Sequence, residues 1–349
     1  MTGSETRLLG ELSMIAREGA GTDELACALS KAIDAVVPHD AARLVGTSPA
    51  ARSIPSAFSF WHGYEADFGR ALLRDYYAGH DPGPPDELAL RPLPVALLGI
   101  GDERRHLRFR SLMSRFGAGS VLRVLLKDVR GIWGMMDLLR GQDAMPFCER
   151  DAERAARLVP ELIEFLRSYV TGGRLARVAP PPPPPPGVII VGADDVIRSA
   201  TPQAHLWRER LEFCSRSPRW TGEVFMIGLA MQTRVHALAP HTAEPLIIGP
   251  AAAYGRWLAC HGQPLGDSGD VAIVIQAATS SQMLPSFCDW YGITARERQI
   301  IGHLRDAMPP KQIARTLELS VHTVNDHLKA VFRKTGACGR DELLAALAG

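Results

Sequence analysis

The sequence has no long hydrophobic run and no large excess of charge of one sign. No stretch approaches the roughly eighteen uninterrupted apolar residues that a membrane-spanning helix needs. The start, MTGSETRLLGELSM, lacks the basic segment and apolar block of a secretory signal, so we expect a cytoplasmic protein without a membrane span. The net charge of +1 excludes a chain that is basic throughout, so any surface for nucleic acid must be local.

Closely spaced cysteines and the signatures of common catalytic sites are also missing. The six cysteines are scattered without a CxxC pair, and in a cytosolic chain the default is reduced thiols that hold no metal. They are Cys27, Cys148, Cys214, Cys260, Cys288 and Cys338. The sequence contains no GxxxxGK[ST] phosphate loop, no HExxH, no GxSxG and no GxGxxG after a strand. We therefore expect no catalytic residue, no metal and no cofactor, and we predict that the protein is not an enzyme.

Seven consecutive prolines, Pro180 to Pro186, divide the chain. A length of 349 residues is too great for one ordinary core and indicates two or three domains. The proline run cannot form a helix or pair in a sheet, and it favours polyproline II at about 3.1 Å per residue. We assign 173–187 as a proline-rich linker, with a docking site for a proline-reading domain as the alternative.

Residues 1–172 have the pattern of a mixed α/β domain. Helices are predicted from apolar residues at helical spacing and strands from short β-rich runs. The predicted helices are 8–17, 23–37, 66–77 and 149–170, and the predicted strands are 41–45, 57–61, 120–127 and 132–140, the last two as a hairpin. The apolar stripe of 149–170 either covers the domain's own sheet or forms a dimer contact.

Residues 188–280 predict a second, smaller α+β module with one antiparallel sheet. The predicted strands are 188–191, 196–199, 246–248, 256–261 and 271–277, and the predicted helices are 201–213 and 220–237. No repeat of fixed period is present, but strands, helices and strands follow one another in both modules. The two modules are therefore candidates for a shared architecture.

Residues 285–349 predict a helix-turn-helix. Thr294 and Glu297 form a capping box that opens a first helix, a second helix spans Lys311–Leu317, and Ser320 caps a third after a tight turn. In the third helix the apolar residues are Val321, Val324, Leu328, Val331 and Phe332, and the opposite face shows His322, Asn325, Asp326, Lys329 and Arg333. A short helix, a tight turn and a helix with a polar outer face suit the major groove of duplex DNA.

This segment resembles the DNA-binding domains of LuxR/FixJ-family regulators. Their pattern LTxREx, KxIAxxLxxS and TVxxHLxxIFxKxG corresponds here to ITARE (293–297), KQIARTLELS (311–320) and TVNDHLKAVFRKTG (323–336). The stretch RDELL (340–344) matches the family's fourth helix, which commonly dimerises. The resemblance therefore implies duplex DNA as the partner, bound by a homodimer. The dimerisation candidates are Leu343, Leu344 and Leu347.

The resemblance also assigns roles to individual residues. Asn325, Asp326 and Lys329 occupy the positions of base contacts, with adenine and cytosine N4 as partners for the first two. The phosphate contacts are assigned to Lys311, Thr323 and Arg333. The sequence departs from the family twice: Asn325 stands where Lys or Arg is common, and Met308-Pro309-Pro310 replaces the usual entry to the second helix and its capping hydroxyl.

Residues 20–170 resemble GAF sensor domains, through the exit VVPHDA (36–41), the strand GIWGMMDLLR (131–140) and Pro146-Phe147. Residues 187–278 are similar to PAS domains, with GRWL (255–258) as the best fragment. The resemblances imply that these modules sense a small molecule of unidentified kind or hold a dimer. Arg104, Arg105, Arg108, Arg110 and Arg115 either form a solvated helix face or receive an anion or DNA. Trp61, His62, His80 and Trp133 line a pocket or hold haem in one interpretation, and in the other the histidines are ordinary surface or core residues.

The sequence thus predicts a multidomain α+β sensor region (GAF-like 1–172, then PAS-like 188–280, with antiparallel sheets flanked by helices) followed by an all-α four-helix LuxR-type domain at 285–349. The predicted function is transcription regulation by a cytoplasmic homodimer that binds an inverted-repeat operator, with RNA polymerase and a small-molecule ligand as further candidate partners. The alternative is a signalling adaptor that acts through protein contacts and has a masked or vestigial DNA-binding domain.

Overall fold

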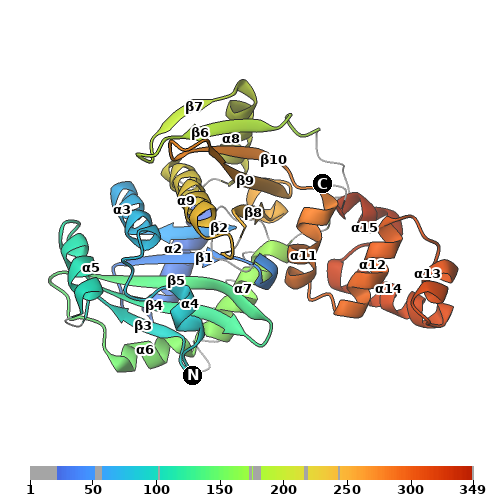
Figure 1. Cartoon of the computed structure of the whole chain (residues 1–349). Coiled ribbons are helices and arrows are strands. Elements are labelled where there is room, and N and C mark those ends of the chain that lie inside the picture. The colour runs from blue at the N-terminus through green and yellow to red at the C-terminus, as the bar shows by residue number, and fades with distance from the viewer. Residues whose placement is uncertain are drawn as a thin grey trace.

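The computed structural model describes residues 22–51, 57–100, 103–172, 175, 182–215, 219–242 and 244–347. These residues form two five-stranded antiparallel sheets with their flanking helices, a connecting helix and a C-terminal group of four helices (Figure 1). The helix predicted at 8–17 and much of the assigned linker lie outside the described residues. Within the described residues, no helix is long and apolar enough to cross a membrane.

The first sheet has the strand order β2-β1-β5-β4-β3, with every neighbouring pair antiparallel. Its strands are β1 (Ala41–Gly46), β2 (Phe58–His62), β3 (Val95–Leu98), β4 (Ala118–Asp128) and β5 (Gly131–Gly141). The predicted strands β1 and β2 and the β4–β5 hairpin are confirmed. Strand β3 is short, and its apolar run was not recognised in the sequence.

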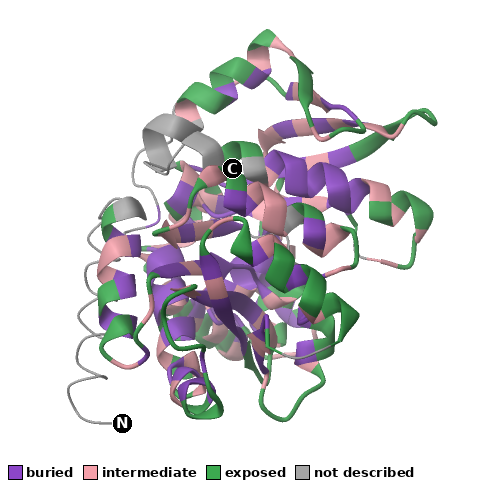
Figure 2. Cartoon of the chain, turned by 90° about the vertical axis from the view of Figure 1, so that its left-hand side faces the viewer, coloured by how far each residue is buried: buried purple, intermediate pink, exposed green. Residues whose placement is uncertain are grey.

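Helices cover both faces of this sheet. Helices α2 (Thr22–Asp34), α6 (Glu149–Ala156) and α7 (Val159–Thr171) pack on one face, together with Leu44 and Leu138. The opposite face, with Val45 and Leu139, is covered by helices α3 (Ala66–Tyr77), α4 (Pro85–Ala89) and α5 (Arg104–Ser114). The buried residues gather along the strands and the inward sides of the helices (Figure 2).

The prediction of one continuous helix over 149–170 is wrong, because the chain breaks into α6 and α7. Leu158 is the N-cap of α7, and Pro160 lies in its first turn. A proline has no N–H to donate and clashes with the carbonyl four residues earlier, so it is tolerated at a helix start but not inside one. The stripe of Leu162, Ile163 and Leu166 nevertheless packs in the core of the first module. This agrees with the interpretation that the stripe covers the domain's own sheet.

The second sheet repeats the strand order of the first. It runs β7-β6-β10-β9-β8, which is again second, first, fifth, fourth and third in chain order. Its strands are β6 (Gly187–Val191), β7 (Ile197–Ala200), β8 (Leu246–Gly249), β9 (Leu258–Leu265) and β10 (Asp270–Ala277). Helices α8 (Pro202–Ser215), α9 (Arg219–Leu238) and the short α10 (Ala251–Tyr254) complete the module. The expected likeness of the two modules is therefore confirmed at the level of topology.

One strand of this sheet is displaced from its prediction. Strand β9 begins at Leu258 and continues to Leu265, whereas 256–261 was predicted. Gly255 has a φ of 72° and forms the left-handed C-cap of α10, so the next residues still belong to the turn. Gly262 is buried, but Gln263, Pro264 and Leu265 are exposed, so pairing with β10 rather than burial extends the end of the strand.

The described prolines of the linker, Pro182–Pro186, are in no helix or strand and lie against α8. The carbonyl oxygens of Pro182 and Pro185 accept hydrogen bonds of 3.0 Å from Arg210 and Trp207. Residues three apart lie on the same side of a polyproline II helix, which has three residues per turn. This end of the proline run is therefore attached to the second module along one side.

The two sheet modules meet through α3 and α9. Arg70 on α3 contacts Glu223 on α9 at 2.6 Å. Asp195, in the β6–β7 turn with a φ of 63°, accepts from Arg74 of α3 at 3.2 Å and from Arg234 of α9 at 2.7 Å. Helix α3 thus touches the first sheet on one side and the second module on the other (Figure 1).

Candidate nucleic-acid interface

The C-terminal helices begin as the sequence predicts. In α12 (Ala295–Arg305), the Thr294 N–H donates to Glu297 at 2.7 Å, and the Glu297 N–H donates to Thr294 Oγ1 at 3.3 Å. This reciprocal pair satisfies two of the amide groups that have no partner inside the helix. Ile300, Ile301 and Leu304 face inward and are buried. The predicted capping box and inward face are confirmed.

Glu297 also ties α12 to the third helix of the domain. Its Oε2 lies 2.6 Å from Lys334 Nζ at the end of α14 (Val321–Thr335), and its side chain is only 5% exposed. Burial by itself raises the pKa of Glu297, but hydrogen bonds from Lys334 and Thr294 outweigh it, and the pKa lies below the ordinary 4.5. The Glu297 carboxylate is therefore ionised at neutral pH, and its buried negative charge is balanced by Lys334.

Replacing Lys334 with methionine is expected to lower the free energy of unfolding of the four-helix domain by about 2 kcal/mol near neutral pH, the scale of a hydrogen bond to a charged group. Because the folded pKa of Glu297 is lowered, the contribution is present above the ordinary carboxyl pKa and is lost as the pH falls through the folded value. Urea unfolding of wild type and K334M should therefore converge in acid. A difference that stays constant from pH 7 to pH 3 would contradict this assignment, and exposed Arg305→Met serves as the control.

The second helix, α13 (Pro310–Thr316), starts with two prolines. Pro309 is the N-cap without a side-chain hydrogen bond, and Pro310 occupies the first turn as predicted. The missing capping hydroxyl is tolerated because Pro310 has no N–H, and the amides of Gln312 and Ile313 reach the Pro309 carbonyl at 2.9 and 3.1 Å. The departure from the family pattern therefore leaves the helix intact.

The turn between α13 and α14 is fixed by backbone and side-chain hydrogen bonds. Glu318 has a φ of 53°, and the Leu319 N–H donates to the Ala314 carbonyl at 2.8 Å. Arg296 of α12 donates to the Leu317 carbonyl at 2.7 Å, and Ser320 Oγ accepts from the Thr323 N–H at 3.0 Å. These contacts set the direction in which α14 leaves the turn, and the predicted Ser320 cap is confirmed.

Helix α14 has one buried and one exposed side. Val324, Leu328 and Val331 are buried against α12 and α13. The three proposed base-contacting residues lie together on the opposite side and are exposed: Asn325, Asp326 and Lys329. The four-helix domain protrudes from one side of the molecule, so α14 is not buried between the sheets (Figure 1). Residues 325, 326 and 329 are accessible in this state.

The charges on this exposed side are paired with one another. Asp326 Oδ2 lies 2.7 Å from His322 Nδ1, and Asp326 Oδ1 accepts from Lys329 Nζ at 3.3 Å. Slight desolvation raises the pKa of Asp326, but hydrogen bonding to Lys329 and the charge of His322 outweigh it, and the pKa is below 3.8. The carboxylate is thus available as an acceptor for a base amino group, while Lys329 offsets its repulsion of phosphates.

The assigned phosphate contacts lie at the margins of this surface. Lys311 is exposed in the first turn of α13, and Arg333 is exposed in the last turn of α14. Thr323 is half-buried, with its Oγ1 2.9 Å from Ser320 Oγ. The exposed base-contact candidates thus lie together on α14. The two cationic phosphate-contact candidates lie on α13 (Lys311) and at the end of α14 (Arg333).

The three dimerisation candidates on α15 (Arg340–Leu347) are not equivalent. Leu343 and Leu347 are 0% and 1% exposed and belong to the core of their own chain, whereas Leu344 is half-buried. The C-terminal end of α15 also contacts the connecting helix α11 (Ser280–Trp290), where Ser280 Oγ donates to the Leu347 carbonyl. Of the three, only Leu344 keeps surface for a second copy in this state.

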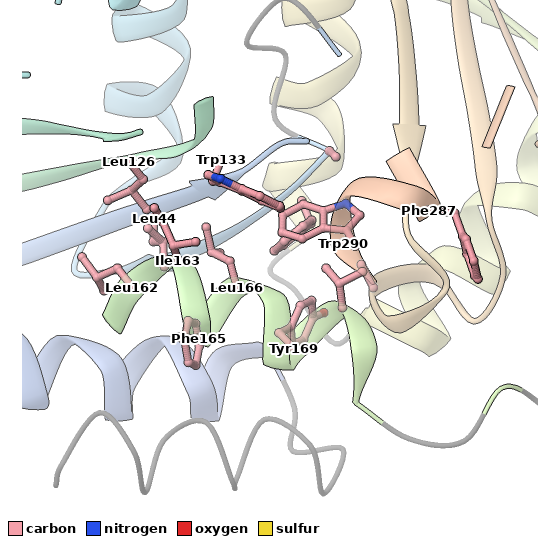
Figure 3. Close-up of a cluster of buried hydrophobic side chains, with 14 of the residues drawn as sticks. Leu44, Leu126, Trp133, Leu162, Ile163, Phe165, Leu166, Tyr169, Phe287 and Trp290 are labelled. Atoms are coloured by element: carbon pink, nitrogen blue, oxygen red, sulfur yellow. The ribbon is translucent and has the colours of Figure 1, made fainter. Parts of the chain in front are cut away.

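Helix α11 was not recognised in the sequence, although it joins all three parts of the molecule. Trp290 is 1% exposed and packs on Trp133 of the first sheet, with ring centroids 5.1 Å apart (Figure 3). It also packs on Phe58 of the same sheet at 5.8 Å. Asp289 accepts from the Ala50 amide at 2.6 Å, and Ser48 donates to Ser286 at 2.9 Å. The C-terminal helices are therefore held against the first module by a buried contact.

Comparisons with known proteins agree with this geometry over the C-terminal segment. The family model described as "Bacterial regulatory proteins, luxR family" matches residues 292–346. The "Monoamine regulon transcriptional regulator" of Klebsiella aerogenes is 43% identical over 53 residues, which cover 15% of this chain and 23% of that regulator. The similarity thus spans under a quarter of the curated relative. The C-terminal segment, with its capped helices and exposed α14, is a helix-turn-helix domain of the luxR family of bacterial regulatory proteins.

Proposed function

We propose that this protein is a transcriptional regulator that binds duplex DNA through α14. The observation that carries the proposal is the exposure of Asn325, Asp326 and Lys329 together on the outer side of a luxR-family helix-turn-helix. Such a helix enters the major groove, where base edges present distinguishable donors and acceptors. In this proposal Asn325 pairs with adenine, Asp326 accepts from cytosine N4, and Lys311, Thr323 and Arg333 contact phosphates.

The same exposure favours regulation over the alternative of an adaptor with a masked DNA-binding domain. Asp326 and Lys329 have side chains that are 52% and 75% exposed while α11 is docked on the first module. The name of the Klebsiella aerogenes relative, a transcriptional regulator, supports the same choice for the domain that the two proteins share. In this proposal α14 therefore binds DNA without first being released from the sheet modules.

We further propose that the protein acts as a cytoplasmic homodimer on an inverted repeat. Residues 285–349 contain nine Lys or Arg and seven Asp or Glu, a surplus of two, so one domain neutralises few phosphates. Two half-sites about one helical turn apart would double the contacts. RNA polymerase is a further proposed partner, and we assign the protein no enzymatic activity.

The two sheet modules are proposed to be the GAF-like and PAS-like sensors of the regulator. Their shared strand order and helix-covered first sheet support this assignment. A ligand or protein signal acts only if it binds one arrangement of the modules better than another. Helix α11 contacts the first module, β8 of the second module and α15, and it is the proposed route of that signal to the DNA-binding domain.

Selection of binding sites from random duplexes tests the function. Wild type is expected to enrich one sequence motif in the presence of competitor DNA, with half-sites in inverted orientation. The double variant Asn325→Ala/Lys329→Ala is expected to bind that motif about 100-fold more weakly, because two base contacts of about 1–3 kcal/mol each are lost. Exposed Arg305→Ala, which removes one charge at the end of α12, is the matched control and should retain the motif. Failure of wild type to enrich any motif would refute the proposal.

A further inference from the structure

A row of polar side chains crosses the first sheet beneath α3. Trp61 on β2 pairs with Arg43 on β1, Arg43 pairs with Asp137 on β5, and Asp137 pairs with Arg123 on β4. Residues directly opposite each other in antiparallel strands point to the same face of the sheet. This face also holds Val45 and Leu139, which belong to the cluster with Phe68 of α3. Two guanidinium groups and a carboxylate thus lie within an apolar interface, where unpaired charge is costly.

Arg123 takes most of the available acceptors. It donates to both oxygens of Asp137 at 2.8 and 3.1 Å, to Asp81 at 2.6 Å and to the Gly83 carbonyl at 3.0 Å. A bidentate guanidinium–carboxylate pair of this kind is the strong form of the ion pair. The buried positive charge of Arg123 is therefore balanced by Asp137 and Asp81.

Arg43 is not compensated in this way. It reaches Asp137 with a single contact of 3.4 Å, to an oxygen that already accepts from Arg123. Its side chain is 12% exposed, and among the described residues its Nε has no hydrogen-bond partner. The buried hydroxyl of Tyr64 likewise has no hydrogen-bond partner among the described residues. Burial of polar groups without partners is uncommon in native proteins and requires an explanation.

Aromatic rings lie beside these two residues. The guanidinium of Arg43 lies 4.6 Å from the ring centroid of Trp61. Tyr64 meets Trp61 edge to face at 5.2 Å and stacks on Phe68 of α3 at 5.5 Å. The Arg43 guanidinium and the Tyr64 hydroxyl can both donate hydrogen bonds to a carboxylate. The neighbouring rings can stack on a flat aromatic group attached to that carboxylate.

We propose that Arg43 and Tyr64 bind the carboxylate of a small planar aromatic acid between the first sheet and α3. This inference rests on the proposed function, because it names the chemical class of the signal that the first module senses. In the structure the guanidinium has a single contact of 3.4 Å with Asp137 and lies against Trp61. The acid supplies the acceptor that Arg43 and Tyr64 lack.

The position of the site gives the ligand a route to the rest of the molecule. Phe68 and Leu72 of α3 pack over this face, while Arg70 and Arg74 of the same helix pair with Glu223 and Asp195 of the second module. A ligand inserted beneath α3 changes the position of that helix, and the ion pairs transmit the change. Helix α3 thus both covers the proposed binding site and contacts the second module.

Calorimetric titration of the full chain without DNA tests the site with three probes. Benzoate is expected to bind, whereas benzamide, its neutral counterpart, and inorganic phosphate, an anion without an apolar body, are expected to bind at least about tenfold more weakly. Equal binding of benzoate and benzamide would overturn recognition of the charge, and phosphate binding alone would overturn the ligand class. No binding of benzoate at millimolar concentration would overturn the proposal. Because DNA is absent, a failure of the proposed function does not affect the result.

Variants separate a binding role of Arg43 from a structural one. Arg43→Met is expected to lose benzoate binding by about tenfold or more and to unfold at about the temperature of wild type, because Asp137 keeps both bonds to Arg123. Tyr64→Phe should weaken benzoate binding about fivefold without altering the fold. Exposed Arg104→Met on α5 is the charge-matched control and should bind as wild type. A large loss of stability in R43M, or unchanged benzoate affinity in R43M or Y64F, would overturn the assignment.

Discussion

Replacing Arg123 with methionine is expected to destabilise the first sheet module by about 3–5 kcal/mol, the usual cost of removing one partner from a buried ion pair. The variant leaves the carboxylates of Asp137 and Asp81 without their main donor, and both side chains are at most 6% exposed. Arg43 cannot replace Arg123, because it reaches Asp137 only at 3.4 Å. Urea unfolding followed by tryptophan fluorescence measures the loss as a lower midpoint.

The matched control for this prediction is Arg43→Met, which removes an arginine side chain from the other neighbour of Asp137 in the same row. In R43M the Asp137 carboxylate still accepts two hydrogen bonds from Arg123, so the urea midpoint should stay close to that of wild type. Equal midpoints for R123M and wild type would show that the network does not stabilise the module. Equal losses for R123M and R43M would show that the two arginines share one structural role.

The helix-turn-helix was predictable in detail because its signals are local. Thr294 and Glu297 lie three residues apart, as do Ser320 and Thr323, so each cap is formed by residues that are neighbours in sequence. The apolar stripe of α14 needs only the periodicity of one helix. No knowledge of distant contacts is required for such features, and the structure agrees with the sequence at both caps and at Val324, Leu328 and Val331. The predicted inward position of Val321 is wrong, because this residue is 39% exposed in the first turn of α14.

The row beneath α3 depends on distant pairing and was missed. Arg43, Asp137 and Arg123 come from three strands, and only the antiparallel register places them side by side. A signal was present, since each is a charged residue at an inward position of an otherwise apolar strand. Its partners could not be named, because strand order and register are set by tertiary packing rather than by alternation.

Helix α11 was missed for a related reason. The segment Ser280–Trp290 contains Pro285 and was left as a connection between modules, yet Thr279 and Gln282 form a capping box at its start. What holds the helix in place lies far away in sequence: the amide of Ala50, Ser48 and the ring of Trp133. Sequence periodicity gives no information on which module such a helix contacts.

The expected effect of Trp290→Ala follows from that contact. Loss of a buried tryptophan usually costs about 3–5 kcal/mol, and here the lost contacts are with Trp133 and Phe58 at the boundary between parts. The interior of the four-helix domain, including Ile300, Val324 and Val331, is untouched. We therefore expect W290A to convert a single calorimetric unfolding transition into two, one for the sheet modules and one for the helix-turn-helix.

Trp290→Phe is the control, because it keeps an aromatic ring against Trp133 and should retain the joint transition. A single transition in W290A at the wild-type temperature would mean that docking of α11 contributes little. Retention of specific binding to a selected half-site is also expected, since Asn325 and Lys329 are exposed and are not among the groups that hold Trp290. If binding by the uncoupled domain then ceases to respond to changes in the first module, the buried contact at Trp290 is the physical link between the two.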